Sequence, residues 1–418
     1  MRLLFLVSRF PYPPDRGDRL TVFHLLQAFS ARHAVTLLSF VSGEEPAESM
    51  ERVAPFCERV VTVRLSPASS WAQAWLGLAS SVPAQVAYYR SPAMAEEVRR
   101  LLAGEGFDAI VAHAIRMAPF VRDLDHPIKI MFQGDSVGQV LGRSVRFAPW
   151  WKRPGILWER RRVDRYIAPS TRRFLETWVL SPGDQEDLMR LGCVRVELVP
   201  HGVDERLFQL EHRPAREVRI MFLGNLSVPH NIDAAVFAAR EIFPAIRAEW
   251  PEARLVLAGA DPAAAVRGLS AIEGVTVTGP LPDLQPLWQS AHVLLAPLRF
   301  STGIQNKVLE AMAAGVPVVT TSSVAEALGA SHGQHLLTAE SAVSLAAAVA
   351  ETLHDPAAAS ARARRAREHV RARFTWDLPV RRLEELVARG WQDRARDATL
   401  AERSSAGRAQ GPSKASPA

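Results

Sequence analysis

The stretch 299–321 contains the residue types that a phosphate-binding site needs. It reads RFSTGIQNKVLEAMAAGVPVVTT. A strand ends before it, a loop containing Gly303 follows, and a helix is predicted from about Asn306 to Gly315. Glycine lets the backbone come close to a ligand, and the free N–H groups and dipole of a helix start attract phosphate. Lys307, in the first turn, adds a positive charge for the same group.

Glu310 extends this site from a phosphate to a nucleotide. It lies three residues after Lys307, hence on the same helix face. Its carboxylate can accept hydrogen bonds from two adjacent sugar hydroxyls, as a ribose offers. The segment Ser301 to Gly315 therefore predicts a clamp for a pyrophosphate and a ribose. The alternative is an ordinary strand–loop–helix connection in which Lys307 and Glu310 form a solvated pair.

The composition limits the class of protein. A chain of 418 residues with 48% apolar and 22% charged residues is long enough for two or three domains. Collagen, coiled-coil and wholly disordered proteins are excluded. No apolar run is long enough to cross a bilayer, and the start, MRLLFLVSRF, predicts a first strand instead of a signal peptide. We therefore expect a cytoplasmic protein.

The cysteines and the net charge limit the class of protein less than the length and composition do. Cys57 and Cys193 form neither a disulfide framework nor a metal-ligand spacing, which fits a reducing compartment. The net charge of +6 indicates that the protein meets anions without naming them.

Short apolar runs alternate with helical patterns along most of the chain. This alternation predicts parallel sheets covered on both faces, so the fold class is α/β with two doubly wound Rossmann-like domains facing a cleft. We expect a first domain over 1–195, a second domain over 196–375, and a disordered tail over 393–418. Ligands of such sheets bind beyond the carboxyl ends of the strands.

One segment, 143–173, is unusually basic and aromatic. It holds ten Arg or Lys residues against Glu159 and Asp164, with Trp150, Trp151, Trp158 and Tyr166 among them. This pattern fits a surface that rests on anionic lipid or binds a lipid diphosphate. The alternative is a solvated helix face with its tryptophans packed inward. Nucleic acid fits less well, because no recognised binding motif accompanies the charge.

The sequence KVLEAMAAGVPVV with its GI-N-K lead-in resembles the donor-binding signature of the GT-B retaining glycosyltransferases of family 4, the glycosyl transferases group 1. The form GIQNKVLEAMA resembles the subgroup linked to exopolysaccharide export and PEP-CTERM sorting. Supporting matches cover roughly 1–390: SRFPYPPDRGDRL, VPHGVD, FLGNLSVPHNIDA and RFTWD.

The resemblance implies that 1–195 forms the acceptor-side domain, that 196–375 forms the nucleotide-sugar-binding domain, and that a helix over 376–392 crosses back to the first domain. It also implies a role for several residues. Lys307 would pair with the diphosphate and Glu310 would bind the ribose. Gly17 would let its loop approach the reacting sugar. His113 falls where many members place a histidine near the transferred sugar, and Asp135 would bind the acceptor or position its hydroxyl. Without the resemblance, a strand-end histidine bonded to backbone and a capping aspartate are the ordinary interpretations.

This chain also departs from the family pattern. Thr302 stands where the fuller signature has a Glu that contacts the sugar, beside the donor-loop residue Gly303. Asn225 and His230 stand roughly where the family has an Arg and a Lys. Charge at the diphosphate would then come from Lys307 and the helix start, or from another residue such as Arg299.

A further departure is His201, which replaces an Asn and is interpreted as structural.

The predicted function is transfer of a sugar from a nucleotide-diphosphate sugar to a hydroxyl acceptor, a glycan or a lipid-linked one, in exopolysaccharide or other cell-envelope glycan biosynthesis. The resemblance implies a retaining, hexosyltransferase-type enzyme. No metal or cofactor is predicted, because a helix start and a lysine can stabilise the leaving group. Two alternatives remain: a sugar-nucleotide epimerase on the same fold, or a non-catalytic binding protein. The protein is expected at the inner face of the plasma membrane if 143–173 contacts lipid.

Overall fold

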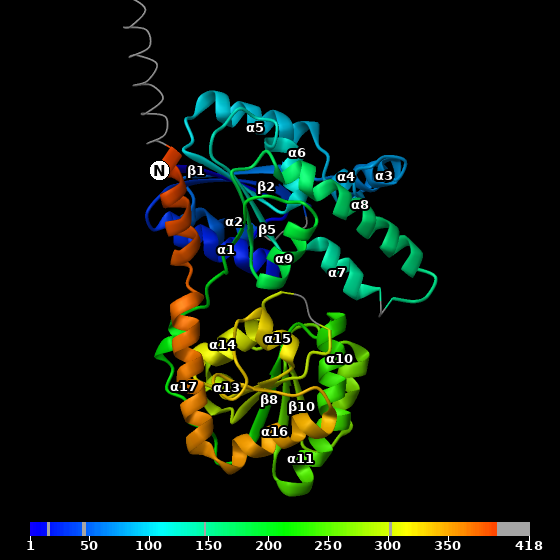
Figure 1. Cartoon of the computed structure of the whole chain (residues 1–418), viewed down its shortest axis with the longest axis vertical. Helices are drawn as coiled ribbons and strands as arrows, with labels where there is room; N and C mark the ends of the chain where they lie inside the picture. Colours follow the sequence, from blue (N-terminus) through cyan, green and yellow to red (C-terminus); the bar gives the residue numbers. More distant parts are fainter. Residues whose placement is uncertain (15–16, 44–46, 146–147, 301–302, 391–418) are drawn as a thin grey trace, which may run out of the picture.

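The computed structural model describes residues 1–14, 17–43, 47–145, 148–300 and 303–390. The chain forms two α/β domains stacked along its long axis, each built on one sheet (Figure 1). All the strand pairs in both sheets are parallel within the described residues. The predicted fold class, two doubly wound domains, is therefore confirmed.

The first domain contains a seven-stranded sheet in the order β3-β2-β1-β4-β5-β6-β7. Its strands are β1 (Arg2–Val7), β2 (Ala34–Val41), β3 (Arg59–Arg64), β4 (Ala109–His113), β5 (Lys129–Gly134), β6 (Glu176–Val179) and β7 (Val196–Leu198). Its helices are α1 (Gly17–Ser30), α2 (Ala47–Val53), α3 (Pro67–Gly77), α4 (Ala84–Tyr88), α5 (Pro92–Gly104), α6 (Ala118–Val121), α7 (Val137–Ser144), α8 (Arg153–Thr171) and α9 (Pro182–Arg190).

Strand β1 shows why this sheet is covered on both faces. Successive side chains of a strand point to opposite faces. Leu4 and Leu6 join one buried cluster, whereas Leu3, Phe5 and Val7 join another. A continuous apolar run is what a parallel strand between two helical layers requires.

The second domain contains a six-stranded sheet in the order β10-β9-β8-β11-β12-β13 around a single large core. Its strands are β8 (Arg219–Leu223), β9 (Arg254–Ala258), β10 (Val275–Gly279), β11 (Val293–Ala296), β12 (Val318–Thr320) and β13 (Leu337–Thr338). Its helices are α10 (Pro229–Phe237), α11 (Phe243–Glu249), α12 (Ala264–Arg267), α13 (Gln285–Ser290), α14 (Asn306–Ala314), α15 (Ser322–Ala327), α16 (Ala342–His354) and α17 (Pro356–Arg373).

Two strands differ from the sequence analysis. The sequence analysis assigns residues 196–198 to the second domain, but β7 pairs with β6 and closes the first sheet. Sequence position misled here, because a three-residue strand carries no sign of its partner. Strand β13 was not predicted, since two residues give no periodicity.

The chain crosses between the domains at one place. Residues 377–390 form a helix on the first domain (Figure 1), and its apolar side chains join a core cluster with β1. Trp376 lies between the rings of His24 and His201, with centroids 5.0 and 5.5 Å away. The backbone N–H of Val203 donates to the carbonyl of Phe374 at 3.3 Å, so the outgoing and returning segments touch.

No helix among the described residues has the length and apolar character to span a membrane. The tail predicted over 393–418 lies outside the described residues.

Candidate functional site

Helix α14 begins and ends as the sequence predicted. Gln305 precedes it in an extended conformation and provides no side-chain cap, so the first N–H groups are not satisfied by a capping side chain. Gly315 ends the helix in the left-handed conformation, with φ of 78°, where glycine carries no Cβ penalty.

Lys307 is held by a network of amides. Its Nζ donates to Asn231 Oδ1 at 2.9 Å and to Gln305 Oε1 at 3.2 Å, and lies 5.5 Å from the Phe222 ring centroid. Only 8% of Lys307 is exposed. Asn231 in turn donates to the carbonyl of Asn225 at 2.9 Å. The ammonium is therefore oriented by neutral acceptors, and its charge is not neutralised by a hydrogen-bonded carboxylate.

Burial shifts the pKa values of Lys307 and of two ionisable side chains near it, Glu310 and His230. Burial lowers the pKa of Lys307 to about 8, which the carboxylate of Glu310 partly opposes. Burial also raises the pKa of Glu310 to about 7, against the charge of Lys307. Burial, followed by the charge of Lys307, lowers the pKa of His230 to about 4. His230 is therefore neutral near pH 7, and it does not supply the positive charge that the family pattern has there.

Asn225 lies in the turn after β8, and the hydrogen bonds of its side chain hold that turn. Its Oδ1 accepts from the Ser227 N–H at 2.9 Å and from the Ser227 hydroxyl at 2.6 Å, while its Nδ2 donates to Asp261 at 3.3 Å. Its side chain shapes the loop, and its carbonyl orients Asn231.

The same strand ends approach each other closely. Gly259, after β9, has φ of 144°, and a Cβ there would lie 1.7 Å from the carbonyl oxygen of Gly224, after β8. Only glycine tolerates this contact.

Gly303 and Asp135 meet across the domains. Gly303 has φ of 60°, and a Cβ there would lie 2.2 Å from Asp135 Oδ1. Asp135 follows β5 in the first domain. Two residues predicted separately, one on the donor loop and one on the acceptor side, are thus brought together.

Asp135 is also electrostatically unusual. Burial and the charge of Asp184 raise the pKa of Asp135 to about 7, against the opposing charge of Arg143. Asp184 accepts the backbone N–H of Ser136 at 2.8 Å, which fixes the chain next to Asp135. A carboxyl group with such a pKa can exchange a proton near neutral pH.

His113 ends β4 as predicted, buried and stacked on Phe132 with centroids 5.5 Å apart. Burial, then the charge of Arg116, lowers the pKa of His113 to about 4, although Asp18 opposes this. Asp18 lies 3.1 Å from Arg9 and 3.7 Å from Arg116.

The Asp18 carboxylate is kept ionised by these neighbours. Burial alone would raise the pKa of Asp18, but the charges of Arg9, His113 and Arg116 together lower it. Gly17, just before it, begins α1, and a Cβ there would meet no atom within 4 Å. The first domain thus presents a charged cluster beside an open glycine.

The remaining predicted residues fall into three groups. Ser301 and Thr302 lie outside the described residues. Arg299 pairs with Asp233, its Nε donating at 2.9 Å. His201 is buried and its Nδ1 lies 3.0 Å from the carbonyl oxygen of Gly202, a structural position.

Sequence reasoning missed Asn231, Gln305, Asp18 and Arg116. Each of them is a polar residue in the loop or the first helical turn that follows a strand, and such residues occur too often for this signal to select them. Within the described residues, no three His, Cys, Asp or Glu side chains gather as metal ligands do.

Comparisons with known proteins show which family and which folds this chain is similar to. Residues 217–355 match the family model described as glycosyl transferases group 1. An uncharacterised 44.6 kDa protein in the cps region of Klebsiella pneumoniae is 25% identical over 144 residues, which are 32% of this chain and 37% of that relative. The chain thus matches little more than a third of this curated relative's length.

Among solved structures, sucrose-phosphate synthase from Thermosynechococcus elongatus is similar with a TM-score of 0.65 and 19% identity, covering 96% of this chain and all of that one. HepE from Anabaena, in complex with UDP and glucose, has a TM-score of 0.65 and 14% identity over 94% of this chain and 99% of that one. A glycosyltransferase from Rickettsia africae has a TM-score of 0.62 and 10% identity over 92% and 97%.

Proposed function

We propose that this chain, whose residues 217–355 match the family model of the glycosyl transferases group 1, is a glycosyltransferase that transfers a sugar from a nucleotide-diphosphate sugar to a hydroxyl acceptor. The observation that carries the proposal is the amide-held ammonium of Lys307 in the first turn of α14, beside the carboxylate of Glu310.

The donor side fits a departing nucleoside diphosphate. The uncapped start of α14 offers backbone N–H groups and a favourable dipole. Lys307 is fixed by Asn231 and Gln305, so stabilising the developing charge requires little reorganisation. Glu310 would accept hydrogen bonds from the ribose hydroxyls. The similar structure of HepE is a complex with UDP and glucose, which supports a nucleotide and a sugar as ligands.

The acceptor side fits a hydroxyl nucleophile held against the donor loop. Asp135, with its raised pKa, would hydrogen-bond the attacking hydroxyl, and its closeness to Gly303 of the proposed donor loop supports this role. His113, neutral at pH 7, would contact the transferred sugar. Retention of anomeric configuration follows from the family resemblance, and no protein nucleophile is assigned.

No metal enters this mechanism. Lys307 and the helix dipole supply the positive potential that a divalent cation would otherwise provide. Turnover is expected to persist in excess chelator, and loss of activity that Mg²⁺ restores would contradict this part of the proposal.

We place the reaction in cell-envelope glycan synthesis at an anionic membrane. The cps region named in the Klebsiella relative's description supports the first part. The second rests on an aromatic surface, α3 together with 148–165. Five of the ten tryptophans are exposed on it: Trp71 61%, Trp75 69%, Trp150 79%, Trp151 61% and Trp158 44%.

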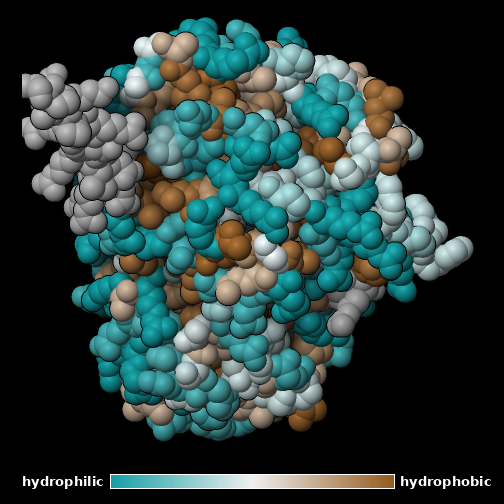
Figure 2. Space-filling view, turned by 45° about the horizontal axis from the view of Figure 1, so that its top comes forward, coloured by the Kyte–Doolittle hydropathy of each residue, from teal (hydrophilic) through white to brown (hydrophobic). Residues whose placement is uncertain are grey.

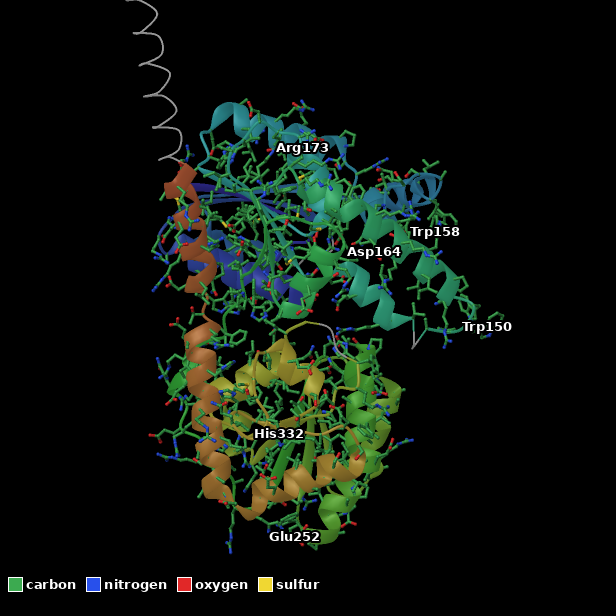
Figure 3. All side chains as sticks on the ribbon, viewed as in Figure 1. Trp150, Trp158, Asp164, Arg173, Glu252 and His332 are labelled. Carbon is green, nitrogen blue, oxygen red and sulfur yellow. The ribbon has the colours of Figure 1, made fainter. Side chains whose placement is uncertain are left out.

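The two parts of the aromatic surface are joined. Arg162 Nη2 donates to the carbonyls of Gly77 and Ser80 at 2.5 and 3.0 Å, and Glu159 accepts the Ala84 N–H at 2.7 Å. Trp150 and Trp158 project from the edge of the first domain (Figure 3). The face shown in Figure 2 is otherwise mainly hydrophilic, with small separate apolar patches. Exposed tryptophans among arginines suit the headgroup region of an anionic bilayer.

Vesicle binding tests this surface. The double variant Trp75→Ala and Trp150→Ala is expected to bind phosphatidylglycerol vesicles roughly tenfold more weakly than the wild type in co-sedimentation, because less apolar area enters the interface. Val343→Ala, an exposed apolar residue of the other domain, is the control. Equal binding by all three proteins would remove the aromatic surface from the proposal.

A screen of nucleoside diphosphates and their sugar conjugates by thermal shift tests the central proposal. The wild type is expected to be stabilised by one base, and Lys307→Ala to weaken its binding by roughly 10- to 100-fold, the value of charge-assisted hydrogen bonds. Glu310→Ala should also weaken binding, while both variants keep the fold. Unchanged affinity in both would refute the site.

Product analysis separates the alternatives. Sugar transfer only when an acceptor is present supports the transferase. Conversion of the nucleotide sugar without any acceptor would indicate the epimerase, and donor binding without turnover on the acceptors supplied would indicate the non-catalytic protein.

A further inference from the structure

His201 lies where the chain crosses from the first domain to the second, and its side chain is held tightly there. Only 3% of His201 is exposed. Its ring stacks on Trp376 with the two planes 16° apart, and Trp376 stacks in turn on His24 of α1. The backbones are also close, because a Cβ on Gly202 would lie 2.3 Å from the backbone nitrogen of Trp376. The imidazole of His201 therefore has little freedom to move.

The same imidazole reaches the start of the proposed donor-binding helix. The side chain of Asn306, the first residue of α14, hydrogen-bonds the imidazole of His201. The carbonyl oxygen of Gly202 is a second partner, 3.0 Å from Nδ1. Burial lowers the pKa of His201 against these two hydrogen bonds. The ring is therefore neutral near pH 7, and it holds Asn306 without bringing a charge to the site.

The first turn of α14 depends on such contacts. It has no side-chain cap, and a helix end without a cap is held less firmly by the helix itself. Lys307 is bound to Asn231 at 2.9 Å, a contact within the second domain. Ile304, just before the helix, packs against core clusters of both domains. The bond from Asn306 to His201 adds a tie to the crossing between the domains.

The crossing also lies close to the other half of the proposed donor site. Burial raises the pKa of Glu310 against the charge of Lys307, and the negative charge of Asp204 adds to this rise. Asp204 follows His201 by three residues. The segment 201–204 therefore acts on both Asn306 and Glu310, at the two halves of the site.

We propose that His201 is a positioning residue for the donor diphosphate. By holding Asn306 against the crossing, it fixes the first turn of α14, so that the N–H groups of this turn and the ammonium of Lys307 face the diphosphate in one orientation. A site held in this way loses less freedom when the anion binds. The inference rests on the proposed donor site and adds to it a residue of the domain crossing.

The affinities for a nucleoside diphosphate and for its nucleoside test this role. UDP, GDP, CDP, ADP and dTDP are titrated into the full-length protein. The one that binds best is compared with the nucleoside of the same base by ligand-observed NMR, which detects weak binding. His201→Phe keeps an aromatic ring on Trp376 but removes the bond to Asn306. It should bind the diphosphate about three- to tenfold more weakly, as expected for one hydrogen bond, and the nucleoside with less than about a twofold change.

Asn306→Ala removes the same hydrogen bond from its other end and should weaken diphosphate binding by a similar factor. Because both residues act through one bond, the double variant with His201→Phe should lose no more than about twofold beyond either single variant. The matched control is His24→Phe, which replaces the imidazole on the opposite face of Trp376. His24 bonds to Gln27 within α1, so this variant should change diphosphate affinity less than about twofold.

Three results would overturn the inference: equal losses of diphosphate affinity in His201→Phe and His24→Phe, an equal loss for the nucleoside in His201→Phe, or losses that add in the double variant. If His201→Phe does not fold, the comparison of diphosphate and nucleoside in Asn306→Ala decides. If the wild type binds none of the five diphosphates, the proposed donor site fails together with this role. Equal diphosphate binding by the wild type and by His201→Phe rejects the role of His201 alone.

Discussion

Lys307 in the second domain and Asp18 in the first both lie beyond the carboxyl ends of parallel strands, yet they are held differently. Lys307 is buried among neutral amides, below strand ends that touch backbone to backbone at Gly224 and Gly259. Asp18 is held by ion pairs, at 3.1 and 3.7 Å, to Arg9 and Arg116.

This difference in how Lys307 and Asp18 are held affects how much each domain can adjust to a ligand. If the proposed donor site is correct, close packing fixes it before a nucleotide binds, which lowers the free-energy cost of binding a diphosphate. Ion pairs around an open glycine leave the acceptor side adjustable. Variants that add atoms should therefore damage the second domain and be tolerated in the first.

The largest effect is expected from Gly259→Ala. Its φ of 144° and a Cβ 1.7 Å from the Gly224 carbonyl leave no room for a side chain. We expect a loss of about 3 kcal/mol in the free energy of unfolding of the second domain, from backbone strain and the clash. In thermal denaturation this is roughly 6 to 12 °C.

Gly268→Ala is the control, since a Cβ there meets nothing within 4 Å, and should shift the midpoint little. If both variants melt together, the strand ends are not packed as described.

A change in pH is expected to have an intermediate effect, on the affinity for the nucleotide. Glu310 has a pKa of about 7 and Lys307 one of about 8. The carboxylate is ionised above the first value and the ammonium is protonated below the second, so nucleotide affinity should be highest between pH 7 and 8. From pH 7.5 to 6, protonation of Glu310 should weaken binding by about eightfold.

The control for this titration is Glu310→Gln, which should lose most of the acid limb and leave only protonation of the phosphate itself, whose pKa is about 6. An unaltered acid limb in that variant would show that Glu310 does not contact the ribose.

The smallest effect on stability is expected from Gly17→Ala. No atom lies within 4 Å of the added Cβ, so the free energy of unfolding should change by no more than about 0.5 kcal/mol. If the loop approaches the reacting sugar, kcat falls while the fold is kept. Unchanged kcat would remove Gly17 from the site, and a large loss of stability would contradict the contrast between the two domains.

Much of the fold was predictable because buried parallel strands leave long apolar runs. The start of α14 and its end at Gly315 were predictable from local sequence signals. Strand β7 was misassigned and β13 was missed, because two or three residues carry no information about their partners.

A candidate site could be predicted where one residue type has a special role, as for Lys307, Glu310 and Gly303, and the binding roles of these residues stay predictions. Asn231 could not be predicted, since its role depends on a lysine 76 positions later. The meeting of Asp135 with Gly303 depends on how two domains are stacked, which no local pattern contains.

The paired crossing at Val203 and Phe374 has a mechanical consequence. Both covalent links between the lobes run through one spot, where Trp376 is sandwiched by two imidazoles. One domain can rotate about this crossing without breaking a strand or changing the path of a loop. The part of the interdomain gap farthest from the crossing then opens most. Substrates can therefore enter on the side of the gap away from the crossing, while the contacts at the crossing are kept.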